Sequence, residues 1–130
     1  DHFNVETNRF RDDAGRYENG TLNYAGIAVM NASLKFFGEF GFDEMEKNTL
    51  ALSGIIIDML EIRGVEVVTP KNEWERGGIV SASIDNAEEI MKKLQQKNII
   101  VAFRAGRIRF APYFYTTEEE VRKAVNAVFD

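Results

Sequence analysis

The chain has 130 residues, enough for one domain, and 45% of them are hydrophobic, which is sufficient for a core. It contains no cysteine, which excludes disulfides and thiolate metal sites, and no apolar run approaches the ~18 residues of a membrane span. The net charge of −5 argues against a general nucleic-acid surface. We therefore expect a cytoplasmic protein that binds neither a membrane nor nucleic acid.

The first 22 residues are polar and contain turn signals at Asp12-Asp13-Ala14-Gly15 and at Asn19-Gly20. We interpret residues 1–22 as an extended arm. The only histidine, His2, lies near the chain end, so we expect no histidine-based metal site. The chain begins with Asp rather than Met, which processing of the N-terminus and excision from a longer protein explain equally well.

Apolar residues recur at helical spacing in four segments, which predicts helices at 23–40, 43–63, 86–97 and 117–129. Gly64 is expected to follow the end of the second helix in a left-handed conformation. Asn86-x-x-Glu89 and Thr117-x-x-Glu120 predict capping boxes at the starts of the third and fourth helices.

Alternating apolar and polar residues predict strands at 65–69, 79–84, 99–104 and 107–111. The last two form a hairpin across Ala105-Gly106, because glycine tolerates the positive φ that a tight turn requires. The resulting order of helices and strands predicts an α+β fold, with helices packed on one face of a mainly antiparallel sheet. We expect this single domain to occupy residues 23–130.

Three arginines, Arg104, Arg107 and Arg109, fall within six positions of the predicted hairpin. Strand alternation places Arg107 and Arg109 on the side opposite Ile108 and Phe110. A guanidinium binds a carboxylate through two parallel hydrogen bonds, so an arginine beside Gly106 could hold an amino-acid carboxylate. The alternative is a solvated sheet face whose arginines balance nearby acids.

Gly20 and Thr21 stand immediately before the first predicted helix. Small and hydroxyl residues at this position make an anion site, because free N–H groups and the positive end of the helix dipole point at the ligand. The alternative is that a Thr or Asn here only caps the helix.

Two segments together resemble the C-terminal small domain of the class V aminotransferase family, whose members use pyridoxal phosphate. They are Arg16-Tyr17-Glu18-Asn19-Gly20-Thr21-Leu22-Asn23 and the run from Phe103-Arg104-Ala105-Gly106 to Tyr115-Thr116-Thr117-Glu118-Glu119. The resemblance implies that Arg104 binds the α-carboxylate of an amino-acid substrate. It also implies that Gly20 and Thr21 contact the phosphate of a cofactor held by the partner subunit of a homodimer. Arg109 and Tyr115 take structural roles in this comparison.

The resemblance covers only the C-terminal part of the family's fold. It implies that the large domain, with the lysine that binds the cofactor, is missing, so we expect no catalytic residue in this chain and no activity from it alone. The absence of cysteine weakens the desulfurase branch and leaves aminotransferase, epimerase-like and kynureninase-like members open. A free-standing α+β module that binds an amino acid or a partner subunit is the alternative.

Overall fold

The computed structural model describes residues 10–18 and 20–130, so His2 lies outside the described residues. The chain divides into two compact units, one ending at Glu39 and one running from Phe40 to Asp130. The predicted boundary after residue 22 stays a prediction. Within the described residues, no helix combines the length and the apolar character that crossing a membrane requires.

The N-terminal unit consists of a short 3-10 helix, η1 (Ala14–Tyr17), and most of helix α1 (Tyr24–Phe40). The apolar residues predicted a helix at 23–40, and α1 confirms it to within one residue. None of its side chains is buried within the described residues, and Ile27 and Leu34 are about half exposed. This helix therefore presents apolar surface that its own unit does not cover.

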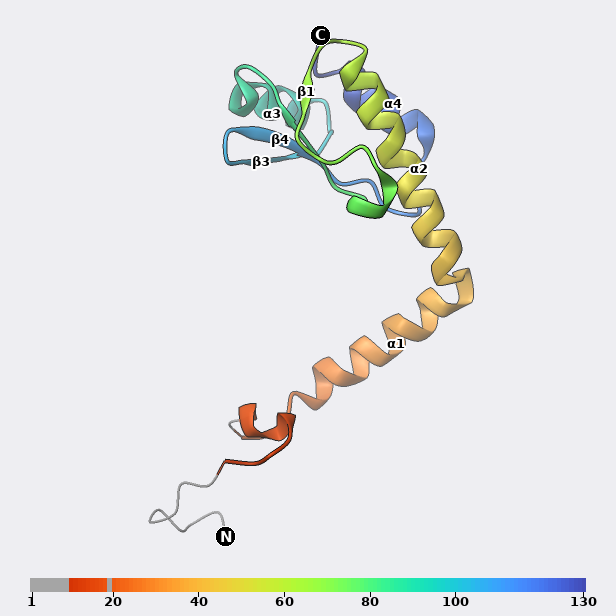
Figure 1. The fold of residues 1–130 in the computed structure, drawn as a ribbon, viewed down its shortest axis with the longest axis vertical. Coiled ribbons are helices and arrows are strands. Elements are labelled where there is room, and N and C mark those ends of the chain that lie inside the picture. The colour runs from red at the N-terminus through yellow and green to blue at the C-terminus, as the bar shows by residue number, and fades with distance from the viewer. Residues whose placement is uncertain (1–9, 19) are drawn as a thin grey trace. The chain divides into compact units, whose positions relative to one another are not determined.

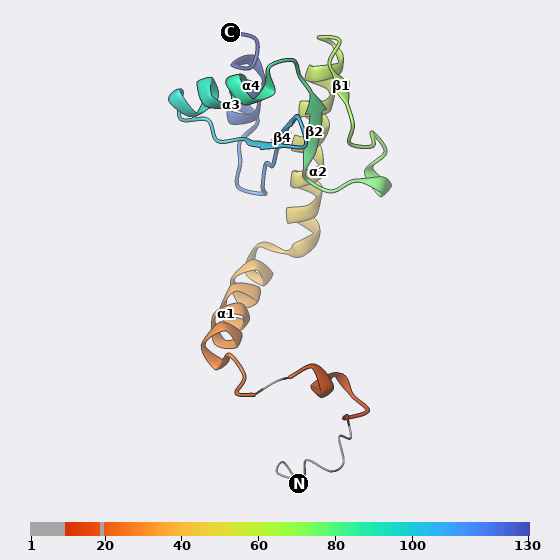
Figure 2. The ribbon, with the colours of Figure 1, turned by 90° about the vertical axis from the view of Figure 1, so that its left-hand side faces the viewer.

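The C-terminal unit contains a four-stranded sheet in which every neighbouring pair is antiparallel. The strands lie in the order β1-β2-β4-β3, and Figure 2 shows β4, β2 and β1 across the sheet. Their bounds are β1 (Glu66–Val67), β2 (Val80–Ser83), β3 (Ala102–Arg104) and β4 (Arg107–Phe110).

Helices cover one face of this sheet. Helix α2 packs against α4, β1 and β2, while α3 packs against β3 and β4 (Figure 1). The predicted α+β class, with helices on a mainly antiparallel sheet, is confirmed. The bounds are α2 (Phe42–Glu61), α3 (Ala87–Gln96) and α4 (Glu118–Asn126), with a short 3-10 helix, η2 (Glu73–Glu75), between β1 and β2.

The two faces of the sheet differ in burial because successive side chains point to opposite sides. On the two central strands the helix-facing side chains are buried: Val80, Ala82, Ile108 and Phe110. These pack with Leu52, Ile56, Leu60, Leu94, Val121 and Val125 of the helices. The opposite side of β2 and β4 carries serines and arginines that are only partly buried. No helix of the C-terminal unit covers that side, and we call it the open face.

Two of the three predicted helix-end signals are confirmed. Gly64 has a φ of +74°, and the N–H of Val65 donates to the carbonyl of Leu60 at 3.1 Å, which closes α2. Thr117 and Glu120 form the reciprocal capping box at the start of α4. The box predicted at Asn86 is wrong: Asn86 has a left-handed φ of 55°, and its side chain makes no capping hydrogen bond.

The strand predicted at 99–104 is shorter in the structure. Asn98 adopts a φ of 59°, and the N–H of Ile99 donates to the carbonyl of Leu94 at 2.9 Å. This bond satisfies a carbonyl at the end of α3 that has no partner within the helix. The N–H of Ile99 therefore caps the helix and does not pair with β4. Pairing with β4 begins only at Ala102.

Candidate functional site

The β3–β4 turn fixes the positions of the three arginines. Ala105 and Gly106 have φ values of 49° and 76°, and positive φ at both central residues is the requirement of a type I′ turn. A two-residue turn of this type sets the register of the hairpin, in which Arg104 lies opposite Arg107 and Ala102 opposite Arg109. Arg107 and Arg109 alternate with buried residues on β4 and so belong to the open face, and Arg104 joins them because it lies directly opposite Arg107. We call them the arginine triad.

Arg109 occupies the most enclosed position of the triad. It lies on β4, between β2 and β3, and its cross-strand neighbours are the small residues Ser81 and Ala102. Its side chain is partly buried, and its Nε is buried without a hydrogen-bond partner among the described residues. A buried donor without a partner costs stability, so this guanidinium is suited to an acceptor that the chain itself does not supply.

Arg104 and Arg107 lie nearer the turn, Arg104 exposed on the edge strand and Arg107 partly buried. Within residues 10–18 and 20–130, no carboxylate lies within the 4.0 Å of an ion pair for any member of the triad. The alternative in which these arginines balance neighbouring acids therefore gains no support from the described residues.

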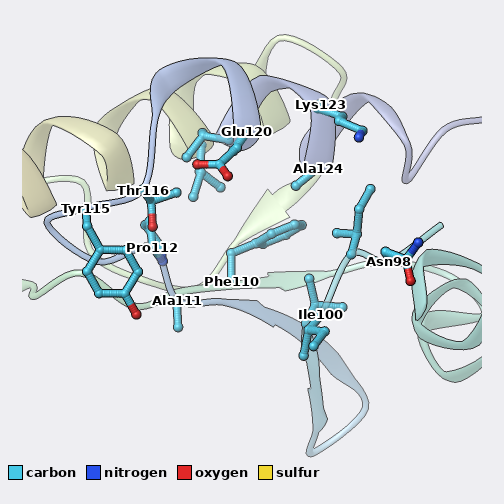
Figure 3. Close-up of a pocket in the computed structure, with 14 residues that line it drawn as sticks. Asn98, Ile100, Phe110, Ala111, Pro112, Tyr115, Thr116, Glu120, Lys123 and Ala124 are labelled. Carbon is cyan, nitrogen blue, oxygen red and sulfur yellow. The ribbon is translucent and has the colours of Figure 1, made fainter. Parts of the chain in front are cut away.

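A cavity of about 390 Å³ lies on another side of the same unit, between residues 98–101, residues 110–112 and α4. Figure 3 shows Lys123 and Ala124 of α4 across from Phe110, with Asn98 at one end and Tyr115 at the other. No arginine lines it, so the sequence-predicted site and this cavity are separate.

Glu120 is the acidic group of this cavity, and it already has partners. Its carboxylate accepts from the backbone N–H of Thr117 at 2.8 Å and from the Thr117 hydroxyl at 2.9 Å. The backbone bond, followed by the hydroxyl bond, lowers the pKa of the Glu120 carboxyl. A carboxylate held in its ionised form as a helix cap is poorly suited to proton transfer.

The Gly-Thr turn lies in the N-terminal unit, before α1. Gly20 and Thr21 are both exposed, and a Cβ built on Gly20 would meet no atom within 4 Å. The cap of α1 is Asn23, whose Oδ1 accepts from the N–H of Gly26 at 2.9 Å. The Thr21 hydroxyl has no hydrogen-bond partner in the described part of the chain, so helix capping does not account for Thr21.

The neighbouring residues of the turn are held locally. Asp13 caps η1 by accepting from the N–H of Gly15 at 2.9 Å. The guanidinium of Arg16 lies 5.5 Å from the ring centre of Phe10 and 5.7 Å from that of Tyr17.

Among residues 10–18 and 20–130, no group of three or more acids and histidines is arranged to hold a metal ion.

Comparison with known proteins places this architecture in a family. The family model described as the kynureninase C-terminal domain matches residues 45–128, which include most of α2, the whole sheet, α3 and α4. The chain belongs to the kynureninase C-terminal domain family. The resemblance to the C-terminal part of class V aminotransferases is thereby confirmed. The arginine triad lies within the matched residues, whereas Gly20 and Thr21 precede them.

Individual relatives agree with this family. The chain is 33% identical over 118 residues to a kynureninase of Geobacillus thermodenitrificans, covering 86% of the chain and 28% of the relative. It is 24% identical over 115 residues to the uncharacterized aminotransferase YcbU of Bacillus subtilis, covering 88% and 31%. The chain thus spans less than a third of the length of these relatives.

A solved structure shares the fold. A cysteine desulfurase from Thermococcus onnurineus superposes with a TM-score of 0.80 at 18% identity, over 94% of this chain and 34% of that protein. At this identity the likeness concerns the fold alone. The sequence pointed to the three arginines as a group, and the family resemblance implied that Arg104 binds the carboxylate and that Arg109 is structural; both roles stay predictions. Arg109 differs from the other two by its place in the middle of a buried strand pattern, between Ile108 and Phe110.

Proposed function

We propose that this chain is the C-terminal part of a pyridoxal-phosphate enzyme of kynureninase or aminotransferase type, acting on an α-amino acid. The relatives' names, kynureninase and aminotransferase, supply the class, and kynurenine is the first substrate to test. When bound, pyridoxal phosphate withdraws electrons from the bonds around the substrate's α-carbon. The part played by this chain is to hold the substrate and the cofactor phosphate.

The main support for the proposal is the buried Nε of Arg109, which has no hydrogen-bond partner among the described residues. A carboxylate that docks there would receive two parallel hydrogen bonds from the guanidinium fork and would satisfy the buried donor. Its cross-strand neighbours Ser81 and Ala102 are small residues. We therefore favour Arg109 as the ligand of the substrate α-carboxylate.

Arg104, the ligand that the family resemblance implies, stays a prediction alongside Arg109. It belongs to the same open face, but it is exposed at the end of the edge strand. A charged hydrogen bond is stronger where water is excluded, so the partly buried Arg109 would gain more from a bound carboxylate. If Arg109 is the ligand, replacing Arg109 abolishes substrate binding; if Arg104 is the ligand, replacing Arg104 does so.

The Gly-Thr turn fits a phosphate. Among the described residues, the Thr21 hydroxyl has no partner and no atom lies close over Gly20; these features and the positive end of the α1 dipole are all suited to an anion. We propose that Gly20 and Thr21 contact the cofactor phosphate held by the partner subunit of a homodimer. The remaining part of the enzyme would supply the lysine that binds the cofactor and the groups that move protons.

The test uses the complete enzyme. Kynurenine and a panel of other α-amino acids are supplied to the protein with pyridoxal phosphate, and consumption of each is followed. The proposal expects turnover of at least one α-amino acid that requires the cofactor and falls sharply in an Arg109→Ala variant. No cofactor-dependent turnover of any amino acid would refute it, and would favour a non-catalytic binding module.

A further inference from the structure

The β3–β4 turn contains features that lower stability. Arg104 and Arg107 are directly opposite each other in the ladder and share one face, and like charges at such positions destabilise a sheet. Ala105 between them adopts a positive φ of 49°, a conformation that costs a residue with a Cβ roughly 1–2 kcal/mol. Natural sequences break local rules of this kind at functional sites, where a ligand compensates the cost.

The surroundings provide no compensation for the like-charge pair. Neither guanidinium has an ion-pair partner among the described residues, although the chain carries a net charge of −5. The acid of the open face is Glu66 of β1, which lies opposite Ser83 of β2 and two strands away from β4. An anion placed between Arg104 and Arg107 would remove their repulsion and accept hydrogen bonds from both.

The position of this pair relative to Arg109 suggests what the anion is. Arg107 and Arg109 are two residues apart on one strand, about 7 Å, and their long side chains extend on the same side. A small molecule with two acidic groups could therefore engage Arg109 with one group and the Arg104–Arg107 pair with the other. We propose that the Arg104–Arg107 pair binds a second anionic group, so that the preferred substrates are amino acids with an acidic side chain.

This inference rests on the proposed function with Arg109 as the α-carboxylate ligand. It adds a side-chain preference that kynurenine, with its aromatic side chain, would not satisfy. Aspartate, glutamate and their sulfinate analogues present the required pair of acids. The Arg104–Arg107 pair would then determine specificity, while Arg109 would serve every α-amino acid alike.

The test measures the affinity of the complete enzyme for succinate, propionate and inorganic phosphate, each titrated separately by calorimetry. Succinate carries two linked carboxylates, propionate carries one, and phosphate represents a free anion. We expect succinate to bind at least tenfold more tightly than propionate, and Arg107→Gln to remove most of that advantage while leaving propionate within about threefold. Arg122→Gln, on α4 and paired with Glu118, is the control and should leave both affinities unchanged.

A second measurement separates binding from folding. Since Arg107→Gln relieves the like-charge pair, its melting temperature without ligand should equal or exceed that of the parent, whereas a damaged fold would melt earlier. An unchanged succinate-to-propionate ratio in Arg107→Gln would overturn the inference, and so would phosphate binding to the cofactor-loaded enzyme as tight as that of succinate. If diacids bind through Arg107 but no amino acid is turned over, the proposed function fails and the anion pair stands. If turnover depends on Arg109 without any preference for diacids, only this inference fails.

Discussion

Replacing Arg109 by methionine should separate substrate binding from stability. Truncating one partner of a buried, charged hydrogen-bond pair costs about 2–5 kcal/mol. At 1.36 kcal/mol per factor of ten, kcat/KM for the amino-acid substrate should fall by about thirty- to several-thousandfold. The loss should appear mainly in KM if the carboxylate is held equally in the ground state and the transition state.

The same substitution should not weaken the fold. The buried Nε of Arg109 has no hydrogen-bond partner among the described residues, and an unsatisfied buried donor costs roughly 1–3 kcal/mol. Methionine has similar length and no donor, so we expect the ligand-free protein to gain about 1 kcal/mol in the free energy of unfolding, measured with urea. Arg109→Lys keeps the charge but loses the planar guanidinium that forms two parallel hydrogen bonds. It should therefore recover only part of the activity that Arg109→Met loses.

Arg104→Met is the matched comparison, because it makes the same chemical change at an exposed position of the same face. Under our proposal it lowers kcat/KM for kynurenine much less than Arg109→Met does. A large loss of activity in Arg104→Met, together with a small one in Arg109→Met, would show that Arg104 is the carboxylate ligand, as the resemblance implies. The partial burial of Arg109 would then not indicate substrate binding. Parallel losses of activity and stability in Arg109→Met would indicate a structural arginine.

Three further predictions concern other parts of the chain. Thr21→Ala in the complete enzyme should lower cofactor affinity about ten- to a hundredfold in a titration of the apo-enzyme. Its melting temperature should not change, because Asn23 caps α1, whereas Asn23→Ala should cost about 1 kcal/mol of stability. Ala105→Gly should raise the free energy of unfolding by about 1 kcal/mol, since glycine adopts positive φ without a Cβ penalty; a decrease would argue against strain at the turn. Because its pKa is lowered in the folded state, ionised Glu120 stabilises the fold above its unfolded pKa. The stabilities of the parent and Glu120→Gln should therefore converge as pH falls from 6 towards 3, and a constant difference would contradict this.

Local patterns predicted most of the secondary structure because each element depends on nearby residues. The apolar stripe of α2, the glycine that follows it and the Thr117–Glu120 box are all read within a few positions. The errors arose where two local demands compete. Asn86 adopts a left-handed conformation instead of capping α3, and Ile99 closes α3 instead of extending β3.

The choice between the arginines could not be made from the sequence, because it depends on the order of the strands. Alternation correctly put Arg107 and Arg109 on the side opposite Ile108 and Phe110, and the register adds Arg104 to that side. Their burial differs because β4 lies between β2 and β3, whereas β3 is at the edge. The insertion of β4 next to β2 is a long-range pairing across α3, and no local pattern encodes it.

The most direct measurement is an experimental structure of the complete enzyme with an unreactive amino-acid analogue bound. We expect the α-carboxylate on the open face of the sheet, with two guanidinium nitrogens of Arg109 about 2.7–2.9 Å from its two oxygens. A carboxylate bound by Arg104 alone, or by residues away from this face, would contradict it.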